Sequence, residues 1–516
     1  MADHDTRPVG ADQLLAEAAE LVGPLGMSLA MLVATDEEAS PDADLKLRYV
    51  FEPAVAGPDR PLADRFLTLV VSLDPAHPAV PSLTGLIPAA SWHEREAQDL
   101  FGIVSLGHPD PRPLVLHDGW PEGVHPMRKS FDGRQVVGRV PAEELPHLIV
   151  EGEGVFEIPV GPIHAGIIEP GHFRFSSVGE TVLHLDARLF YTHRGLEKRI
   201  EGMSWIDGFH IAERLCGVCS VAHGLGYCEA VEQIAGVAAP ARARVVRAIA
   251  LELERLYNHT GDIGNICAGA SYHYGTSAGL RIKEGLQRLN EQLAGNRFLR
   301  GWLMPGGIQR DLEAGSLPAI ESALRRTEDA LAHLTQRIDT NPTVVDRLDD
   351  TGLLSRQAAV DLATTGVAAR ASGVNRDARR DHPHAAFAGP DPVEPRVVTD
   401  DAGDVNARRR VRALEAHESI RLVRLLVARL EPGPILTPLP DQLPPWRIGL
   451  ASTESPRGAS IHWLRSDASG RIDRYHVRSA SYANWPAVPL AAQTAIVPDF
   501  PLVNKSFELC YACTDR

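Results

Sequence analysis

The stretch RLCGVCSVAHGLGYCEAVE, residues 214–232, holds half of the six cysteines in this chain of 516 residues. Cys216 and Cys219 are three residues apart, and His223 follows four residues later. If residues 210–232 form a helix, these three side chains lie on one face of it. Two thiolates on adjacent turns make a natural grip for a soft metal ion. The spacing therefore predicts a metal half-site on a helix.

A second pair with the same spacing, Cys510 and Cys513, lies in the closing sequence CYACTDR, so that four thiolates can converge on one site. Two such pairs are typical of structural zinc, but zinc ribbons keep their pairs about 15–20 residues apart. Here more than half of the chain separates them. Spacing alone leaves an unusual or catalytic metal, a zinc ion and no metal as alternatives. Cys228 and Cys267 stand singly in apolar helical stretches and are predicted to be core residues.

The composition is that of an ordinary globular protein, with 44% hydrophobic and 23% charged residues. The formal net charge of -15 argues against a nucleic-acid partner, because no basic excess is available to displace counterions from phosphate. No apolar run is long enough to span a membrane, and the acidic N-terminus does not resemble a secretory signal. We therefore expect a cytoplasmic protein, in which paired cysteines are metal ligands or catalytic groups rather than disulfides.

The hydrophobic pattern predicts an α+β fold with a small N-terminal α+β domain fused to a large, mainly α-helical domain. We place the first domain at residues 1–130, a linker at 131–157 and the second domain at 158–516. In the first domain we expect a helix at 11–22, strands at 28–35, 45–53 and 65–73, and a charged helix opening the stretch 88–120. In the second we expect strands between 158 and 202, followed by helices at 207–236, 240–260, 277–295, 316–338 and 405–431.

The cysteine pattern resembles that of the large subunit of nickel–iron hydrogenases. Several flanking stretches narrow the resemblance to the membrane-associated, energy-converting group of the formate hydrogenlyase type. These stretches are GPIHAGIIEPGHFRF (161–175), YTHRGLEK (191–198), GGIQRD (306–311), RASGVNRDARRDHPHAAF (370–387) and ESPRG (454–458). WHEREAQDLFGI (92–103) and the proline-rich stretch after it are similar to the C subunit of respiratory complex I, and the second domain is similar to the D subunit of that complex.

The resemblance implies a ligand set and a cofactor. Cys216, Cys219, Cys510 and Cys513 would hold nickel. Cys219 and Cys513 would bridge to an iron that also carries carbon monoxide and cyanide. A second, structural cation, magnesium or iron, is implied at Glu197 in HRGLEK; the alternative there is a solvated helix glutamate.

The resemblance also implies catalytic residues around the metals. Glu169 would be the first proton relay, Arg457 would lie over the open side of the centre, and His223 would hydrogen-bond near it. The plainer alternatives are a turn residue, a surface turn and an ordinary helix histidine. The family usually has Asp-Pro before the last cysteine pair, whereas this chain has Glu508 and Leu509. Glu508 keeps the carboxylate on a longer side chain, so its partnership with Arg457 is expected to change.

The implied reaction is the reversible conversion of H2 to two protons and two electrons. The electrons would leave through iron–sulfur clusters of a separate small subunit, because this chain has too few further cysteines to bind a cluster. The other implied partners are membrane-arm subunits of a complex I-like assembly, with the chain peripheral on the cytoplasmic face of the inner membrane. Two rival interpretations are a quinone-binding subunit of the complex I type, which lacks the four cysteines, and a non-catalytic scaffold without a nickel–iron centre.

Overall fold

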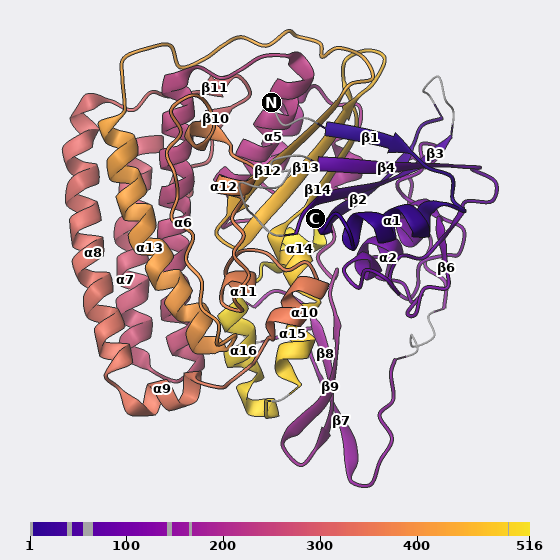
Figure 1. Cartoon of the computed structure of the whole chain (residues 1–516), viewed down its shortest axis with the longest axis horizontal. Coiled ribbons are helices and arrows are strands. Elements are labelled where there is room, and N and C mark those ends of the chain that lie inside the picture. Colours follow the sequence, from indigo (N-terminus) through magenta and orange to yellow (C-terminus); the bar gives the residue numbers. More distant parts are fainter. Residues whose placement is uncertain (1–3, 39–43, 55–65, 142–146, 165–167, 494) are drawn as a thin grey trace.

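The computed structural model describes residues 4–38, 44–54, 66–141, 147–164, 168–493 and 495–516 (Figure 1). Its N-terminal part is built on a four-stranded sheet with the order β1-β4-β3-β2, in which β1 runs parallel to β4 and the other neighbours are antiparallel. The elements are β1 (His4–Pro8), α1 (Leu14–Val22), β2 (Met27–Asp36), β3 (Leu45–Pro53), β4 (Phe66–Leu73), β5 (Ala79–Pro81), α2 (Ala90–Phe101) and β6 (Val104–Leu106). They match the predicted helices and strands; residue 65 of the last predicted strand lies outside the described residues.

Both faces of this N-terminal sheet are covered. Helices α1 and α2 contact β2 from one side. On the other side Met31, Val33 and Val50 pack against Ile461 and Trp463 of the second domain. Burial on both faces explains why β2 is a nearly continuous apolar run rather than an alternating one.

A second sheet, β7-β8-β9, projects from the lower part of the molecule in Figure 1. It consists of β7 (Val155–Val160), β8 (His172–Val178) and β9 (Thr181–Arg188), with antiparallel pairing throughout. β7 begins at Val155, within the stretch that the sequence assigned to the linker.

The large domain combines a layer of long helices with a third sheet. The helices α6 (Ala241–Gly269), α7 (His273–Ala294), α8 (Leu317–Asp339) and α13 (Val405–Ala428) stand side by side at the left of Figure 1. The sheet has the order β12-β13-β14, formed by β12 (Ile448–Ser455), β13 (Gly458–Ser466) and β14 (Ile472–Arg478). Helix α5 (Ser220–Ala235) packs against β12 and β13, between the sheet and the helical layer.

Shorter elements complete the domain. The helices are α3 (Leu196–Arg199), α4 (Trp205–Ala212), α9 (Pro342–Leu348), α10 (Arg356–Asp361), α11 (Gly366–Arg370), α12 (Ala378–Asp381), α14 (Ala480–Asn484), α15 (Ala487–Ala492), α16 (Phe500–Phe507) and α17 (Tyr511–Asp515). A small hairpin joins β10 (Leu303–Met304) and β11 (Gly307–Ile308), and 3-10 turns occupy Ala314–Ser316, Ala385–Phe387 and Val497–Asp499. None of the helices in the described ranges is long and apolar enough to cross a bilayer.

The α+β architecture is as predicted, but one of the predicted helices needs correction. The predicted helix 207–236 is two helices, α4 and α5, and the first cysteine pair lies in the break between them. Apolar side chains of the N-terminal part pack into the core of the large domain. One buried cluster joins Leu69 and Phe101 of the N-terminal part to Phe173, Trp485 and Val503 of the large domain. The two parts therefore share a core, because both faces of the N-terminal sheet need covering.

Candidate metal centre

The two cysteine pairs meet in the interior of the molecule. The sulfur atoms of Cys216, Cys219 and Cys513 all lie within 4.8 Å of one another, and all three residues are buried. Cys510 is partly buried and packs against the same cluster. The structure thus brings together the four predicted ligands, from segments that are distant in the sequence.

The two pairs have the same local geometry. The Cys216 sulfur accepts a hydrogen bond from the backbone N–H of Cys219 at 3.2 Å, and the Cys510 sulfur accepts one from the N–H of Cys513 at 3.4 Å. Cys219 directly precedes α5, and Cys510 directly precedes α17. Each pair is therefore a turn that leads into a helix, not a face within a helix.

Side chains from distant parts of the sequence stabilise the first cysteine turn. The Glu254 carboxylate on α6 accepts hydrogen bonds from the backbone N–H groups of Val221 and Ala222, at 2.7 and 2.9 Å. These are first-turn amides of α5, which lack partners within the helix. The Arg300 guanidinium donates to the Cys216 carbonyl at 3.4 Å. The break between α4 and α5 is stable because tertiary contacts replace the helical hydrogen bonds that it loses.

Arg194 connects the two turns directly. Its Nη2 donates to the carbonyl of Leu215 at 2.6 Å and to that of Ala512 at 3.0 Å. Asp515 supports the second turn by accepting hydrogen bonds from the N–H groups of Phe190 and Thr192, at 3.0 and 2.9 Å. The segment before α3 thus contacts both cysteine turns and fixes their relative position.

The electrostatics of the cluster favour a bound cation. The pKa of the Cys216 thiol is held well below its ordinary range, because the other three thiols donate hydrogen bonds to it. The pKa of Cys219 is raised well above its ordinary range, because it donates to Cys216. Four thiols this close cannot all lose their protons without a compensating positive charge. The donor set fits a soft, thiophilic metal, which would deprotonate all four.

Arg457 lies beside this cluster in the interior. Its guanidinium makes two hydrogen bonds with Asp262 on α6, at 2.8 and 3.1 Å, and its distance to the Glu508 carboxylate is 3.9 Å. Burial by itself would lower the pKa of Arg457, but the negative charges of Asp262, Cys219, Glu508 and Cys510 raise it above its ordinary value. Its surroundings therefore exclude the surface-turn alternative.

Glu508 is the last residue before the second cysteine pair, in a left-handed conformation with φ of 54° at the end of α16. Burial raises its pKa to about 7, and the neighbouring Asp262 charge adds to the rise. Asn265 donates to its carboxylate. The closest acceptor for Arg457 is thus Asp262, while Glu508 is held at a longer distance.

Glu169 faces the second cysteine turn. Its carboxylate accepts a hydrogen bond from the backbone N–H of Ala512, between Cys510 and Cys513, at 3.0 Å. Burial raises its pKa, and negative charge on Cys216 and Asp515 raises it further. A half-buried carboxyl at this position can hold and release a proton.

His223 contacts the cluster from the first turn of α5. Its Nε2 lies 3.2 Å from the Cys513 sulfur, and its Nδ1 lies 3.3 Å from Nε2 of His462 on β13. Both histidines are buried. The plain alternative of an unengaged helix histidine does not hold.

Glu197 belongs to a different cluster. It is buried, with Glu96 of α2 and His476 of β14 within 4.8 Å, which is a metal-capable geometry. Two guanidinium groups already contact it, from Arg474 at 2.8 Å and from Arg516 at 2.9 Å. The solvated-glutamate alternative is therefore wrong, and a cation at Glu197 stays a prediction.

Eight of the nine predicted site residues lie in one place: the four cysteines, Glu169, His223, Arg457 and Glu508. The sequence prediction missed Arg194, Glu254, Asp262 and His462. A signal existed for Asp262, because NHTGDIGN (258–265) places several polar residues in a helix that is otherwise buried. Arg194 lies in YTHRGLEK (191–198), one of the stretches that carry the family resemblance. His462 gives no local signal, since an isolated histidine in a strand has no spacing to read.

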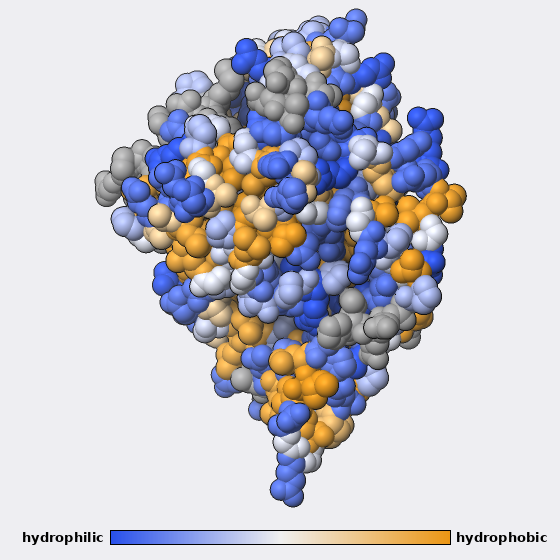
Figure 2. All heavy atoms as spheres, turned by 90° about the vertical axis from the view of Figure 1, so that its right-hand side faces the viewer, coloured by the Kyte–Doolittle hydropathy of each residue, from blue (hydrophilic) through white to orange (hydrophobic). Residues whose placement is uncertain are grey.

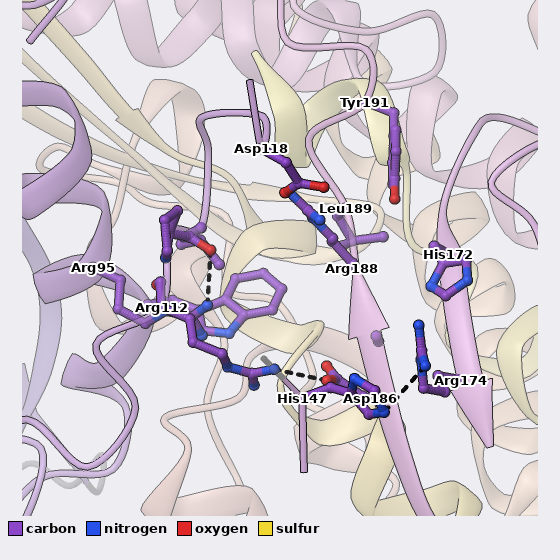
Figure 3. Close-up of a pocket in the computed structure, with 14 residues that line it drawn as sticks. Arg95, Arg112, Asp118, His147, His172, Arg174, Asp186, Arg188, Leu189 and Tyr191 are labelled. Carbon is purple, nitrogen blue, oxygen red and sulfur yellow. Dashed lines mark hydrogen bonds and ion pairs between the residues drawn. The ribbon is translucent and has the colours of Figure 1, made fainter. Parts of the chain in front are cut away.

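A pocket of about 230 Å³ lies between the N-terminal part and the sheet of β8 and β9 (Figure 3). Two of its arginines are paired across the space: Arg112 with Asp186 at 2.8 Å, and Arg188 with Asp118. These pairs cross-link the two parts of the chain. We therefore interpret this pocket as part of the ion-paired contact between the two parts of the chain, and not as a second candidate active site.

Three known families match parts of the chain. They are described as the respiratory-chain NADH dehydrogenase 49 Kd subunit (residues 274–449 and 441–516), the respiratory-chain NADH dehydrogenase 30 Kd subunit (residues 9–137) and nickel-dependent hydrogenase (residues 194–261). The last match contains the first cysteine turn together with Arg194, His223 and Glu254.

Individual proteins match over most of the chain. Formate hydrogenlyase subunit 5 of Escherichia coli K12 is 35% identical over 87% of this chain and 79% of its own length. Hydrogenase-4 component G of the same organism is 34% identical over 84% of this chain and 76% of its own length. A chain in the structure of an archaeal membrane-bound sulfane sulfur reductase has the same fold, with a TM-score of 0.66 and 24% identity, covering 70% of this chain and 99% of that one.

Proposed function

The chain belongs to the family of large subunits of membrane-associated, energy-converting nickel–iron hydrogenases of the formate hydrogenlyase type, and we propose that it catalyses the reversible conversion of H2 to two protons and two electrons. The observation that carries the proposal is the convergence of two Cys-x-x-Cys turns in a buried site. A complex I-type quinone subunit has no use for four such thiols. A structural zinc site would not need the buried arginine, the carboxyl and the histidine that surround them.

The cofactor of the proposal is a nickel–iron centre. Cys216, Cys219, Cys510 and Cys513 would hold the nickel, and Cys219 and Cys513 would also hold the iron with its carbon monoxide and cyanide ligands. When bound, this centre supplies the two-electron chemistry that splits dihydrogen. Thiolates suit soft metals, and burial excludes competing water.

The side chains around the thiolates transfer protons and place fixed charges beside the cluster. Glu169, hydrogen-bonded to the backbone between Cys510 and Cys513, takes up a proton and passes it outward. Burial raises its pKa, so it binds a proton more readily than an exposed glutamate. Arg457 places a fixed positive charge beside the cluster, and Asp262 fixes its orientation with two hydrogen bonds. Glu508 is the second carboxyl on that arginine.

Electrons need a carrier outside this chain. The remaining cysteines, Cys228 and Cys267, are buried in different helices, α5 and α6, and cannot together bind a cluster. An iron–sulfur small subunit is therefore part of the proposal.

Exposed apolar side chains support docking to partner subunits. Figure 2 shows the face that carries the N-terminal part, with hydrophobic side chains gathered at its lower end. Around the sheet β7-β8-β9 the exposed residues include Leu148, Ile149, Phe156, Ile163 and Val178. Contiguous exposed apolar surface of this kind marks an interaction site. We assign it to the small subunit and the membrane arm of a complex I-like assembly, on the cytoplasmic face of the inner membrane.

The test is elemental analysis of the purified complex for nickel, iron and zinc, with an infrared spectrum of the same sample. We expect one nickel per chain and sharp bands in the metal carbonyl and cyanide region. Zinc alone, or the absence of both metal and bands, would contradict the proposal and leave a scaffold or quinone-type subunit.

A further inference from the structure

Three buried rings form a hydrogen-bonded line that starts at Cys513. His223 Nε2 lies 3.2 Å from the Cys513 sulfur, and His223 Nδ1 lies 3.3 Å from His462 Nε2. His462 Nδ1 lies 2.8 Å from the hydroxyl of Tyr475 on β14. The two imidazole rings and the phenol ring are at most 1% exposed. The line thus crosses from α5 through β13 to β14 without reaching solvent.

The direction of every bond in this line follows from its first member. In the proposed function, on which this inference rests, Cys513 is a metal-bound thiolate with no proton to donate. His223 Nε2 must then carry the proton and donate to the sulfur. A neutral imidazole has one donor and one acceptor, so His223 Nδ1 accepts from His462 Nε2. His462 Nδ1 in turn accepts from the hydroxyl of Tyr475.

We propose that Tyr475 and His462 are positioning residues that lock His223 in the tautomer whose N–H points at the Cys513 sulfur. The hydrogen bond to sulfur withdraws electron density from the thiolate and so tunes the metal pair. Neither residue touches the metals, and each acts through the ring before it.

The neutral forms that this line needs are favoured by burial. Burial raises the pKa of Tyr475 well above its ordinary value, and burial lowers the pKa of His462 well below its own. The fold also makes room for the line. A Cβ on Gly226 of α5 would come within 2.4 Å of the His462 ring, so the glycine in GLGY is what lets this histidine reach His223.

The experiment compares two tyrosines in the assembled complex. Tyr475→Phe keeps the ring and removes the donor to His462. Tyr227→Phe is the matched control, because Tyr227 is also buried and its ring lies 5.6 Å from that of Tyr475, but its hydroxyl donates to the Trp205 carbonyl. The readouts are the infrared band of the iron-bound carbon monoxide and the nickel content.

We expect Tyr475→Phe to shift the carbonyl band to lower wavenumber or to split it, because His223 can then adopt the other tautomer and the sulfur becomes more electron-rich. Tyr227→Phe should leave the band in place. His462→Leu should give the larger shift, and His462→Gln, whose amide N–H replaces Nε2–H, should restore the band.

Two results would overturn the inference. An unchanged band in Tyr475→Phe with full nickel content means that Tyr475 does not orient His223. A shift of equal size in Tyr227→Phe means that the effect is one of packing. If the unsubstituted complex has no nickel and no such bands, the proposed function fails and the inference fails with it, which is distinct from either result. Tyr475→Phe keeps the proposal testable if a His462 variant does not fold.

Discussion

Two clusters in this molecule have the geometry of a metal site, and they differ in how their charge is compensated. The thiols of Cys216, Cys219 and Cys513 lie as close together as the side chains of Glu96, Glu197 and His476. Arg516 contacts both glutamates of the second cluster, with Glu96 at 2.7 Å, and Arg474 adds a second guanidinium. At the thiol cluster, Arg194 and Arg300 donate to backbone carbonyls, and the charge of Arg457 is paired with Asp262. In the carboxylate cluster, arginine side chains supply the positive charge that a bound cation would supply in the thiol cluster.

The clusters also differ in their effect on pKa. The pKa of Glu197 is held well below its ordinary value by His476, Arg516 and Arg474, against the effect of burial. The three thiols that donate to Cys216 have pKa values raised well above theirs. The negative charges of the carboxylate cluster are therefore paired with arginines, and Arg516 links α2 of the N-terminal part to the end of the chain. In the proposed function, a metal ion supplies the positive charge that would let all four thiols ionise.

The largest expected effect follows from removing a thiol. Cys510→Ala should abolish nickel binding, because three thiolates no longer close the site. Cys267→Ala is the matched control: this cysteine is buried in α6, outside the cluster, and should retain full nickel content. Elemental analysis of the purified complexes checks both. Retained nickel in Cys510→Ala would refute the ligand assignment.

Replacing the carboxyl next to the thiols tests proton transfer rather than metal binding. Glu169→Gln should lower turnover by roughly 10²–10⁴-fold while nickel stays bound, because the amide accepts the Ala512 hydrogen bond but carries no transferable proton. Glu157→Gln on β7 should leave turnover unchanged. Hydrogen-dependent dye reduction measures the rate. Full activity in Glu169→Gln would remove it as the relay.

The carboxylate cluster should matter for stability. Glu197→Gln is expected to lower the free energy of unfolding by about 3–5 kcal/mol, because Arg474 and Arg516 would remain buried with a weaker acceptor. The control Glu17→Gln breaks a solvent-exposed pair with Arg7 and should cost about 0–1 kcal/mol. Urea unfolding measures both values.

The same measurement examines the predicted cation at Glu197. An unfolding midpoint of the unsubstituted protein that does not change with magnesium would show that the two guanidinium groups already satisfy the carboxylate. A midpoint that rises with magnesium concentration would instead support a second structural cation.

The smallest effect concerns Glu229, a partly buried acid that forms no ion pair with any residue in the described part of the chain. Glu229 accepts a hydrogen bond from the Ala385 N–H, and burial raises its pKa from 4.5 to about 7. The native state therefore holds this proton more tightly than the unfolded chain, and stability falls as pH rises from about 4.5 to about 7. Glu229→Gln should remove a slope of at most about 1.4 kcal/mol per pH unit. Identical pH profiles of urea unfolding for the two proteins would contradict this.

The sequence alone predicted which side chains meet at the candidate site and most of the local structure. The cysteine spacing, with Glu169, His223, Arg457 and Glu508, identified the groups that the fold brings together. Periodicity placed the strands β2 to β4 and the long helices α7, α8 and α13 to within a few residues of where they lie, and it placed the start of α6, which continues to Gly269 beyond the predicted end at residue 260. These patterns are local, since each element shows which of its own side chains must be buried.

Tertiary structure decided what depends on partners far along the chain. The break between α4 and α5 exists because Glu254 and Arg300 satisfy backbone groups that a continuous helix would have satisfied itself. Arg457 pairs more closely with Asp262 than with Glu508, because α6 brings that aspartate within 2.8 Å. The N-terminal part shares a core with the large domain because each leaves apolar surface that the other covers. Periodicity within one segment cannot report a contact whose partner lies in another.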